Sequence, residues 1–130
     1  MRNRTVKRIA IAFIVIWFMV GGIGHFLVPN FFLQIIPPSL PFRIQAVYLS
    51  GFFELVGAAG LLHPMYRKSA GVGLFVLTIV VTPANVYMWL NPTLFPAIPK
   101  FVLAFRLVVQ VMLLALIWWS SQNRNAVATR

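Results

Sequence analysis

The sequence predicts an all-α integral membrane protein, an antiparallel bundle of four transmembrane helices that forms one domain over residues 1–130. Three observations predict this class. Hydrophobic residues make up 61% of the 130 residues and charged residues only 9%, whereas about half of a soluble domain is apolar. The mean hydropathy is +0.90. Four stretches, at 9–28, 46–62, 69–90 and 101–119, come close to the roughly 20 apolar residues that cross a bilayer as helix.

The first stretch, 9–28, follows a cluster of four basic residues and could be mistaken for a signal peptide. Its apolar run is longer than the roughly 7–15 residues of a signal-peptide core, and no A-x-A cleavage site follows it. We therefore interpret it as a retained membrane anchor. The four basic residues are Arg2, Arg4, Lys7 and Arg8.

The second and third stretches, 46–62 and 69–90, are joined by the short segment HPMYRK. A connection this tight predicts that the two helices are antiparallel neighbours. The two outer connections, PNFFLQIIPPSLPFR and NPTLFPAIPK, combine apolar residues with several prolines. They are too apolar for free aqueous loops and too broken by proline to span. We expect them to lie flat at the outer interface over the mouth of the bundle, with a re-entrant segment as the alternative.

Basic residues predict the orientation, because Lys and Arg are enriched in cytoplasmic connections. Eight of them lie before the first stretch, between the second and third, and after the fourth, which places them on one side of the predicted bundle. Only Arg43 and Lys100 lie on the other side. We therefore expect both termini in the cytoplasm. The remaining basic residue, Arg106, falls inside the fourth stretch.

Five polar side chains fall at a similar depth in the outer half of the predicted membrane. Glu54, the only acidic side chain of the protein, is eight residues into the second stretch, roughly 12 Å at a rise of about 1.5 Å per residue. Arg106 is five residues into the fourth stretch, roughly 8 Å deep. The shared depth predicts a polar pocket. Asn85, His25 and Gln110 are the other three side chains at this depth, and Tyr48 and Ser50 are further candidate residues of the pocket.

Charge predicts a partner for Glu54. An isolated ion in hydrocarbon costs from about 3 to more than 10 kcal/mol, depending on the method, and Arg106 is the only Lys or Arg inside a predicted span. We therefore expect Glu54 and Arg106 to pair. Gly21 and Gly22 would leave space beside the imidazole of His25. Two interpretations of the Glu54–Arg106 pair stay open: it locks the helices together, or it belongs to a functional site.

Composition excludes several chemistries. Because it has no cysteine, the chain forms no disulfide, holds no Fe–S cluster and exchanges no thiol, and with one acid we expect no protein-built metal site. His25 and His63 lie about a membrane thickness apart, so they cannot ligate one haem within a monomer. The net charge of +10 does not indicate nucleic-acid binding, since the basic residues form no stripe. Their placement suits lipid headgroups.

These residues also carry a resemblance to the DoxX and DoxX-like family of small membrane proteins. The resemblance covers about residues 10–119 and is carried by GHF at 24–26, YLSGFFELVGAAGLL at 48–62, RKSA at 67–70, PANVYM at 83–88, Arg106 and Gln110. It implies a compact four-helix bundle in the bacterial cytoplasmic (inner) membrane. Similar members are linked to quinone-coupled thiosulfate oxidation beside another subunit, others to redox-stress assemblies, and distant relatives to assembly of membrane proteins. Related redox bundles use a cysteine pair, and its absence here excludes direct disulfide chemistry.

The resemblance and the polar pocket together favour a quinone- or lipid-interacting accessory subunit of a redox system. Such a chain is at most one subunit of a quinone-linked oxidoreductase, because electrons must come from a redox partner. His25, Asn85 and Arg106 would donate hydrogen bonds to the quinone oxygens, and Glu54 would accept a proton. The chain builds no cofactor site of its own beyond this bound quinone or lipid. The alternatives are a non-enzymatic scaffold or assembly factor, and a carrier of protons or small solutes.

Overall fold

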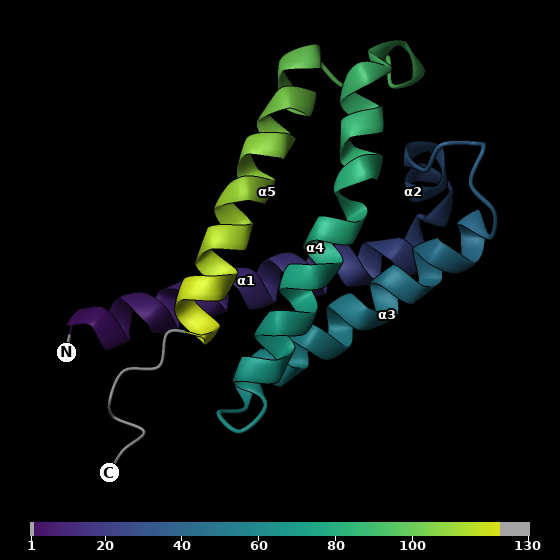
Figure 1. Ribbon diagram of the computed structural model, residues 1–130. Coiled ribbons are helices and arrows are strands. Elements are labelled where there is room, and N and C mark those ends of the chain that lie inside the picture. Colours follow the sequence, from purple (N-terminus) through teal and green to yellow (C-terminus); the bar gives the residue numbers. More distant parts are fainter. Residues whose placement is uncertain (1, 123–130) are drawn as a thin grey trace.

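The computed structural model describes residues 2–122, with the backbone alone at residues 2 and 3, and this part of the chain is entirely helical apart from its connections. Four of its helices are long and apolar enough to cross a membrane. The elements are α1 (Arg2–Leu27), α2 (Pro29–Ile35), α3 (Arg43–Leu62), α4 (Arg67–Leu90), the 3₁₀ turn η1 (Pro92–Leu94) and α5 (Lys100–Ser121) (Figure 1).

The four long helices coincide with the four predicted stretches. Each begins before the predicted apolar run, and α1 does so by the most because its first turns carry the basic residues that hydropathy does not count. Helices suit such sequences because every backbone N–H and C=O inside the segment is paired without help from water. The helix α4 continues through Pro83, although the ring removes one backbone hydrogen bond.

The first outer connection contains a helix that the sequence analysis did not predict. This helix, α2, begins at Pro29, a position that tolerates proline because the first N–H of a helix has no intrahelical partner. Arg43 at the start of α3 donates from Nη2 to the carbonyl oxygens of Leu33, at 2.7 Å, and Ile36, at 2.9 Å. One guanidinium therefore holds the end of α2 against α3.

Among the long helices, α1 packs most extensively against α3, and α4 packs against α5 and, almost as extensively, against α3. We refer to α1 with α3 and α4 with α5 as the two helix pairs. In Figure 1 the partners within each pair run in opposite directions, and the two pairs are inclined to each other. Contacts of α3 with α4 and of α1 with α5 join the pairs. The main apolar core lies where the pairs meet. Its buried members are Ile11, Ile14, Val15, Phe18, Ala58, Leu61, Leu74, Leu113 and Ile117.

A second apolar cluster fastens both outer connections to the long helices. Ile35 from α2 and Phe95, just after η1, are buried against Met88 of α4 and Leu103 of α5. These connections therefore fold back onto the helices instead of extending from them. This packing explains why both connections are rich in apolar residues, since each of them buries a large side chain.

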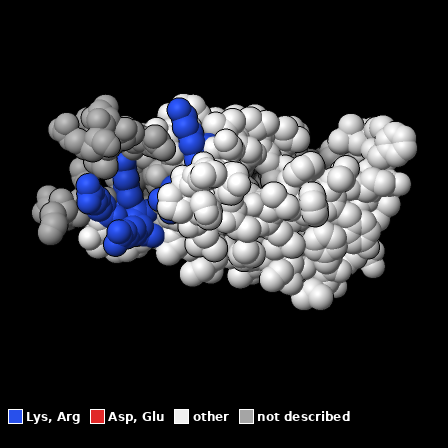
Figure 2. Space-filling view, turned by 90° about the horizontal axis from the view of Figure 1, so that it is seen from below, with Lys and Arg blue, Asp and Glu red and all other residues white. Residues whose placement is uncertain are grey.

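Lys and Arg side chains gather at one end of the molecule (Figure 2). At this end Lys7 of α1 lies over the ring of Trp119 of α5, with Nζ 5.5 Å from the ring centroid. Gln122 donates to the carbonyl oxygen of Lys68 at 2.6 Å, so the end of α5 meets the start of α4. The basic residues of the tail, Arg124 and Arg130, lie outside the described residues.

Candidate functional site

A cavity of about 670 Å³ lies between α1, α3, α4 and α5. Its volume is within the range of roughly 300–1,000 Å³ that is typical of small-molecule sites. Most of the lining side chains are apolar, and polar side chains from all four helices reach it as well. The polar members are His25, Ser50, Glu54, Thr78, Asn85, Arg106 and Gln110.

The cavity opens sideways between α1 and α5. Ile16 and Val20 of α1 line it and are 63% and 68% exposed, and Phe105 of α5 lines it and is 62% exposed. Lining residues with so much free surface mark the rim of an opening. All three are apolar, so a molecule that enters here meets hydrocarbon side chains first and polar groups only deeper inside.

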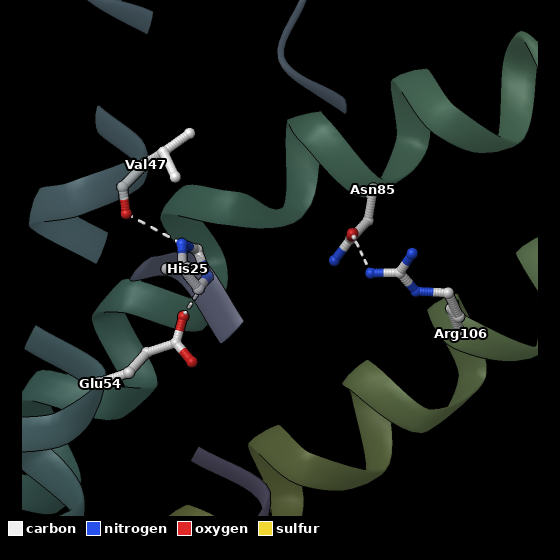
Figure 3. A network of polar contacts seen from close by, with 5 residues as sticks. All are labelled: His25, Val47, Glu54, Asn85 and Arg106. Atoms are coloured by element: carbon white, nitrogen blue, oxygen red, sulfur yellow. Dashed lines mark hydrogen bonds and ion pairs between the residues drawn. The ribbon is translucent and has the colours of Figure 1, made fainter. Parts of the chain in front are cut away.

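On the α1–α3 side of the cavity, Glu54 pairs with His25. Glu54 Oε2 lies 3.0 Å from His25 Nε2, and each side chain is only 11% exposed. The other ring nitrogen, Nδ1, lies 2.9 Å from the carbonyl oxygen of Val47 (Figure 3). The imidazole also stacks on Phe32 of α2, with ring centroids 4.0 Å apart. These contacts fix the ring on both edges and on one face.

The two ring contacts determine the charge of the pair. A carbonyl oxygen can only accept, so Nδ1 of His25 carries a hydrogen and donates it to Val47. A second hydrogen must lie between Nε2 and the Glu54 carboxyl group, because two lone pairs would repel each other at 3.0 Å. Whether this hydrogen is on nitrogen or on oxygen, the His25–Glu54 pair has a net charge of zero.

Glycines make room for this pair where α1 crosses α3. A Cβ atom at Gly21 would lie 2.8 Å from Glu54 Oε1, and one at Gly51 would lie 2.6 Å from Cβ of His25 and 3.1 Å from the carbonyl oxygen of Gly22. The space predicted beside Gly21 and Gly22 is therefore present, but at Gly21 it holds the carboxyl group rather than the imidazole. Close approach at small residues is the usual way in which membrane helices bring polar groups together.

On the α4–α5 side of the cavity, Arg106 contacts neutral acceptors. Its Nη2 donates to Asn85 Oδ1 at 3.3 Å (Figure 3), and its Nη1 donates to the sulfur of Met88 at 2.9 Å. A thioether is a weak acceptor. Arg106 is partly buried, and neither of these contacts balances its positive charge.

Gln110 extends this network along the seam between α4 and α5. Its side-chain oxygen accepts a hydrogen bond from Asn85 Nδ2, and its Nε2 donates to the carbonyl oxygen of Thr78 at 2.8 Å and to the hydroxyl of Thr82. Thr78, Thr82 and Asn85 therefore lie on one face of α4, and all three contact Gln110 of α5.

The predicted pairing of Glu54 with Arg106 is wrong. Among the described residues, the ion-pair partner of Glu54 is His25 and Arg106 has no carboxylate partner. Figure 3 shows the two groups in separate clusters, with the carboxyl group of Glu54 joined to His25 and the guanidinium of Arg106 joined to Asn85. The packing of α1 along α3 supplies a closer partner than α5 can. The sequence analysis counted only permanent charges, and the signal that it undervalued was His25.

Tyr48 is also misplaced in the prediction. Its ring stacks on Phe26, with centroids 5.6 Å apart, and it is 41% exposed and does not line the cavity. Its neighbour Val47 is buried against α1, and successive residues of a helix point in directions about 100° apart. Tyr48 therefore points outward, whereas Ser50 lines the cavity as predicted.

The fold and the cavity define an all-helical protein with four helices long and apolar enough to cross a membrane. Between these helices lies a mainly apolar cavity that polar side chains also line. The chain belongs to the family described as Domain of unknown function (DUF8561), whose model matches residues 14–121. The match includes every polar residue of the cavity. No curated protein and no solved structure matches the chain.

Proposed function

We propose that this protein is a four-span bundle of the bacterial cytoplasmic membrane that binds a membrane-dissolved amphiphile, a quinone or a lipid, in the cavity. The observation that carries the proposal is the lateral opening between α1 and α5, which leads from exposed apolar side chains to polar groups at the other side of the cavity. A molecule entering from the bilayer would keep its tail in hydrocarbon while its polar end reached those groups.

The orientation that we propose places both termini in the cytoplasm. The concentration of Lys and Arg at one end of the molecule (Figure 2) supports it, because positive charge favours the cytoplasmic side. The cavity residues His25, Asn85 and Arg106 lie toward the ends of their helices that would face outward. The polar groups would then lie in the outer half of the bilayer.

A quinone is the ligand that the resemblance to the DoxX family favours. Its two carbonyl oxygens need donors, and Arg106 has N–H groups that neither Asn85 nor Met88 uses. The hydrogen shared by His25 and Glu54 could be exchanged with the headgroup when it is reduced or oxidised. Electrons would pass to or from a partner protein, so the chain would act as an accessory subunit of a redox system.

A scaffold or assembly factor without catalytic activity is the second candidate. It is favoured by the extent to which the polar residues satisfy one another, since Gln110, Asn85 and His25 all have partners within the protein. In this interpretation the polar groups only hold the helices together, and exposed apolar faces bind other membrane proteins.

Mass spectrometry of the gently purified protein tests the proposal. Val109 lines the cavity, whereas its neighbour Val108 is exposed and does not line it. Val109→Trp should fill part of the cavity and lose the co-purifying quinone or lipid, and the matched control Val108→Trp should keep it. Equal retention by both variants and the unaltered protein would reject the cavity as the binding site and favour the scaffold. Circular dichroism and thermal unfolding verify that each variant is folded.

A further inference from the structure

We infer that the ligand of the cavity is an anionic amphiphile whose carboxylate or phosphate group binds Arg106. The inference rests on the proposed function, since it takes the cavity to be a binding site open to the membrane. Of the two ligand classes proposed above, it selects the lipid, a molecule with a negatively charged headgroup and an apolar chain, over the uncharged quinone that the family resemblance favours.

The charge of the cavity carries the inference. Glu54 is the only acidic side chain among the 130 residues, and its hydrogen-bonded partner is His25. Because both ring contacts of His25 need a hydrogen, that pair is neutral as a whole. Of the charged side chains that line the cavity, Arg106 therefore keeps an unbalanced positive charge. An unbalanced ion at membrane depth is unfavourable, and an anionic ligand removes that cost.

The donors of Arg106 suit an anionic oxygen group. A guanidinium has five N–H donors in one plane and binds carboxylate or phosphate through two parallel hydrogen bonds. Within residues 2–122, Arg106 donates two hydrogen bonds, one to Asn85 and one to Met88. Asn85 is held in turn by Gln110. The guanidinium is thus positioned by neutral groups while donors remain for a ligand.

The surroundings of Arg106 account for the apolar chain of the ligand. Phe105, the next residue on α5, lies at the rim of the cavity, and Phe13 and Trp17 line the opposite rim on α1. All three are exposed, so in a bilayer they would contact lipid tails. A headgroup at Arg106 can therefore leave its chain between α1 and α5.

Binding of defined amphiphiles in nanodiscs tests the inference. The probes are oleate and phosphatidylglycerol, with phosphatidylcholine and ubiquinone as ligands without net charge and inorganic phosphate as a soluble anion, all measured by native mass spectrometry. We expect Arg106→Gln to reduce retention of oleate or phosphatidylglycerol about tenfold, the effect of losing one charged contact. Arg106→Lys should reduce it less, since the ammonium keeps the charge but not the planar donors.

Lys100→Gln is the matched control, because Lys100 begins the same helix and does not line the cavity. It should retain the anionic probes at the level of the unaltered protein. If Arg106→Gln does not fold, the test uses the unfolding temperatures of the other variants with and without oleate. A ligand that binds only the folded state raises the unfolding temperature. Oleate should then stabilise the unaltered protein and Lys100→Gln more than it stabilises Arg106→Lys.

The outcomes separate this inference from the proposed function. If Val109→Trp loses the amphiphiles but Arg106→Gln retains oleate and phosphatidylglycerol fully, the cavity binds ligands and the anionic recognition is rejected. If Val109→Trp also retains them fully, both are rejected. Preference for ubiquinone over oleate in the unaltered protein would overturn the anionic class. If inorganic phosphate binds as strongly as oleate, the ligand needs no apolar chain, and the claim that it is an amphiphile is rejected in favour of a simple anion site.

Discussion

The imidazole of His25 links three elements through four contacts, to Val47, Glu54, Phe32 and the helix crossing at Gly51. Each polar contact uses one hydrogen, so His25 and Glu54 together form a pair without net charge. This distinguishes His25 from Arg106, which forms no ion pair with a carboxylate in the described part of the chain. The consequences of substitution at the two residues should therefore differ in kind.

The first prediction concerns the coupling of His25 with Glu54. His25→Phe keeps the stacking area but removes the partner of the Glu54 carboxyl group and the side-chain hydrogen bond to the Val47 carbonyl oxygen, so we expect a loss of about 3 kcal/mol in the free energy of unfolding. Glu54→Gln should cost less, since the amide can still donate to Nε2. The double variant His25→Phe/Glu54→Leu should lose less than the sum of its single variants. Reversible unfolding in mixed micelles measures these differences.

The same measurement separates the two candidate partners of Glu54. Because Glu54 and Arg106 do not form an ion pair, the losses of Glu54→Gln and Arg106→Gln should add within about 0.5 kcal/mol. A coupling above about 1 kcal/mol between them would contradict the arrangement in Figure 3.

The second prediction concerns Gly21. A methyl group there would lie 2.8 Å from Glu54 Oε1, so Gly21→Ala must displace the carboxyl group from His25. We expect a loss of about 1–3 kcal/mol in the free energy of unfolding. Gly73→Ala is the matched control, since a Cβ at Gly73 would meet nothing within 4 Å. It should be neutral or stabilise the protein by up to about 1 kcal/mol through helix propensity. Equal losses in both variants would reject a specific role of Gly21.

At the scale of elements, the pairs α1–α3 and α4–α5 are held together by different kinds of polar contact. The first pair is joined through a histidine and a carboxyl group at a glycine crossing. The second is joined by a network of amides and hydroxyls centred on Gln110, which is buried. The hydroxyls of Thr78 and Thr82 donate to carbonyl oxygens of α4 itself, so the donor that joins this face to α5 is Nε2 of Gln110.

The third prediction concerns this seam. Gln110→Leu removes the acceptor of Asn85 Nδ2 and the donor to the Thr78 carbonyl and the Thr82 hydroxyl at a buried site, so we expect a loss of about 1–3 kcal/mol in the free energy of unfolding. The same change at the exposed Gln45 of α3 should leave stability within about 0.5 kcal/mol of the unaltered protein. The two variants are compared by thermal unfolding in one detergent. Unchanged stability of Gln110→Leu would show that the network contributes nothing to the packing of α4 on α5.

For the whole molecule, the cavity exists because the two helix pairs are inclined and meet chiefly at the apolar core. That core lies nearer the basic end of the molecule, with Ile14 and Ile117 among its fully buried members. Toward the other end, where the polar residues lie, α1 and α5 separate enough to leave the cavity between them.

The fourth prediction concerns topology across the membrane. Because the chain has no cysteine, a single introduced cysteine reports one position without background. We expect Thr93→Cys, in the second outer connection, to react with a membrane-impermeant maleimide on intact cells. Met65→Cys, in the turn between α3 and α4, should react only after the membrane is permeabilised. Both positions are exposed. Labelling of both from the same side would contradict the proposed four spans.

The sequence by itself determined the membrane class, the four long helices and the set of polar residues that would share a depth. These follow from local properties, because a helix in a membrane satisfies its own backbone groups and its rise per residue converts position into depth. Six of the seven predicted residues, all except Tyr48, line the cavity. The short helix α2 was not predicted, because a short connection of proline and apolar residues shows no helical periodicity of apolar and polar positions.

Only the tertiary structure decided which polar groups meet. Depth and helical face state the level and direction of a side chain, but they do not state which helix lies opposite. The close approach of Gly22 to Gly51 places α1, and with it His25, against Glu54, while Asn85 of α4 meets Arg106. The choice of neighbours depends on how the helices pack along their whole length, which no single stretch of sequence contains. As a physical consequence, the charge of Glu54 is balanced by His25 within the α1–α3 pair. The positive charge of Arg106 has no such partner and faces the cavity.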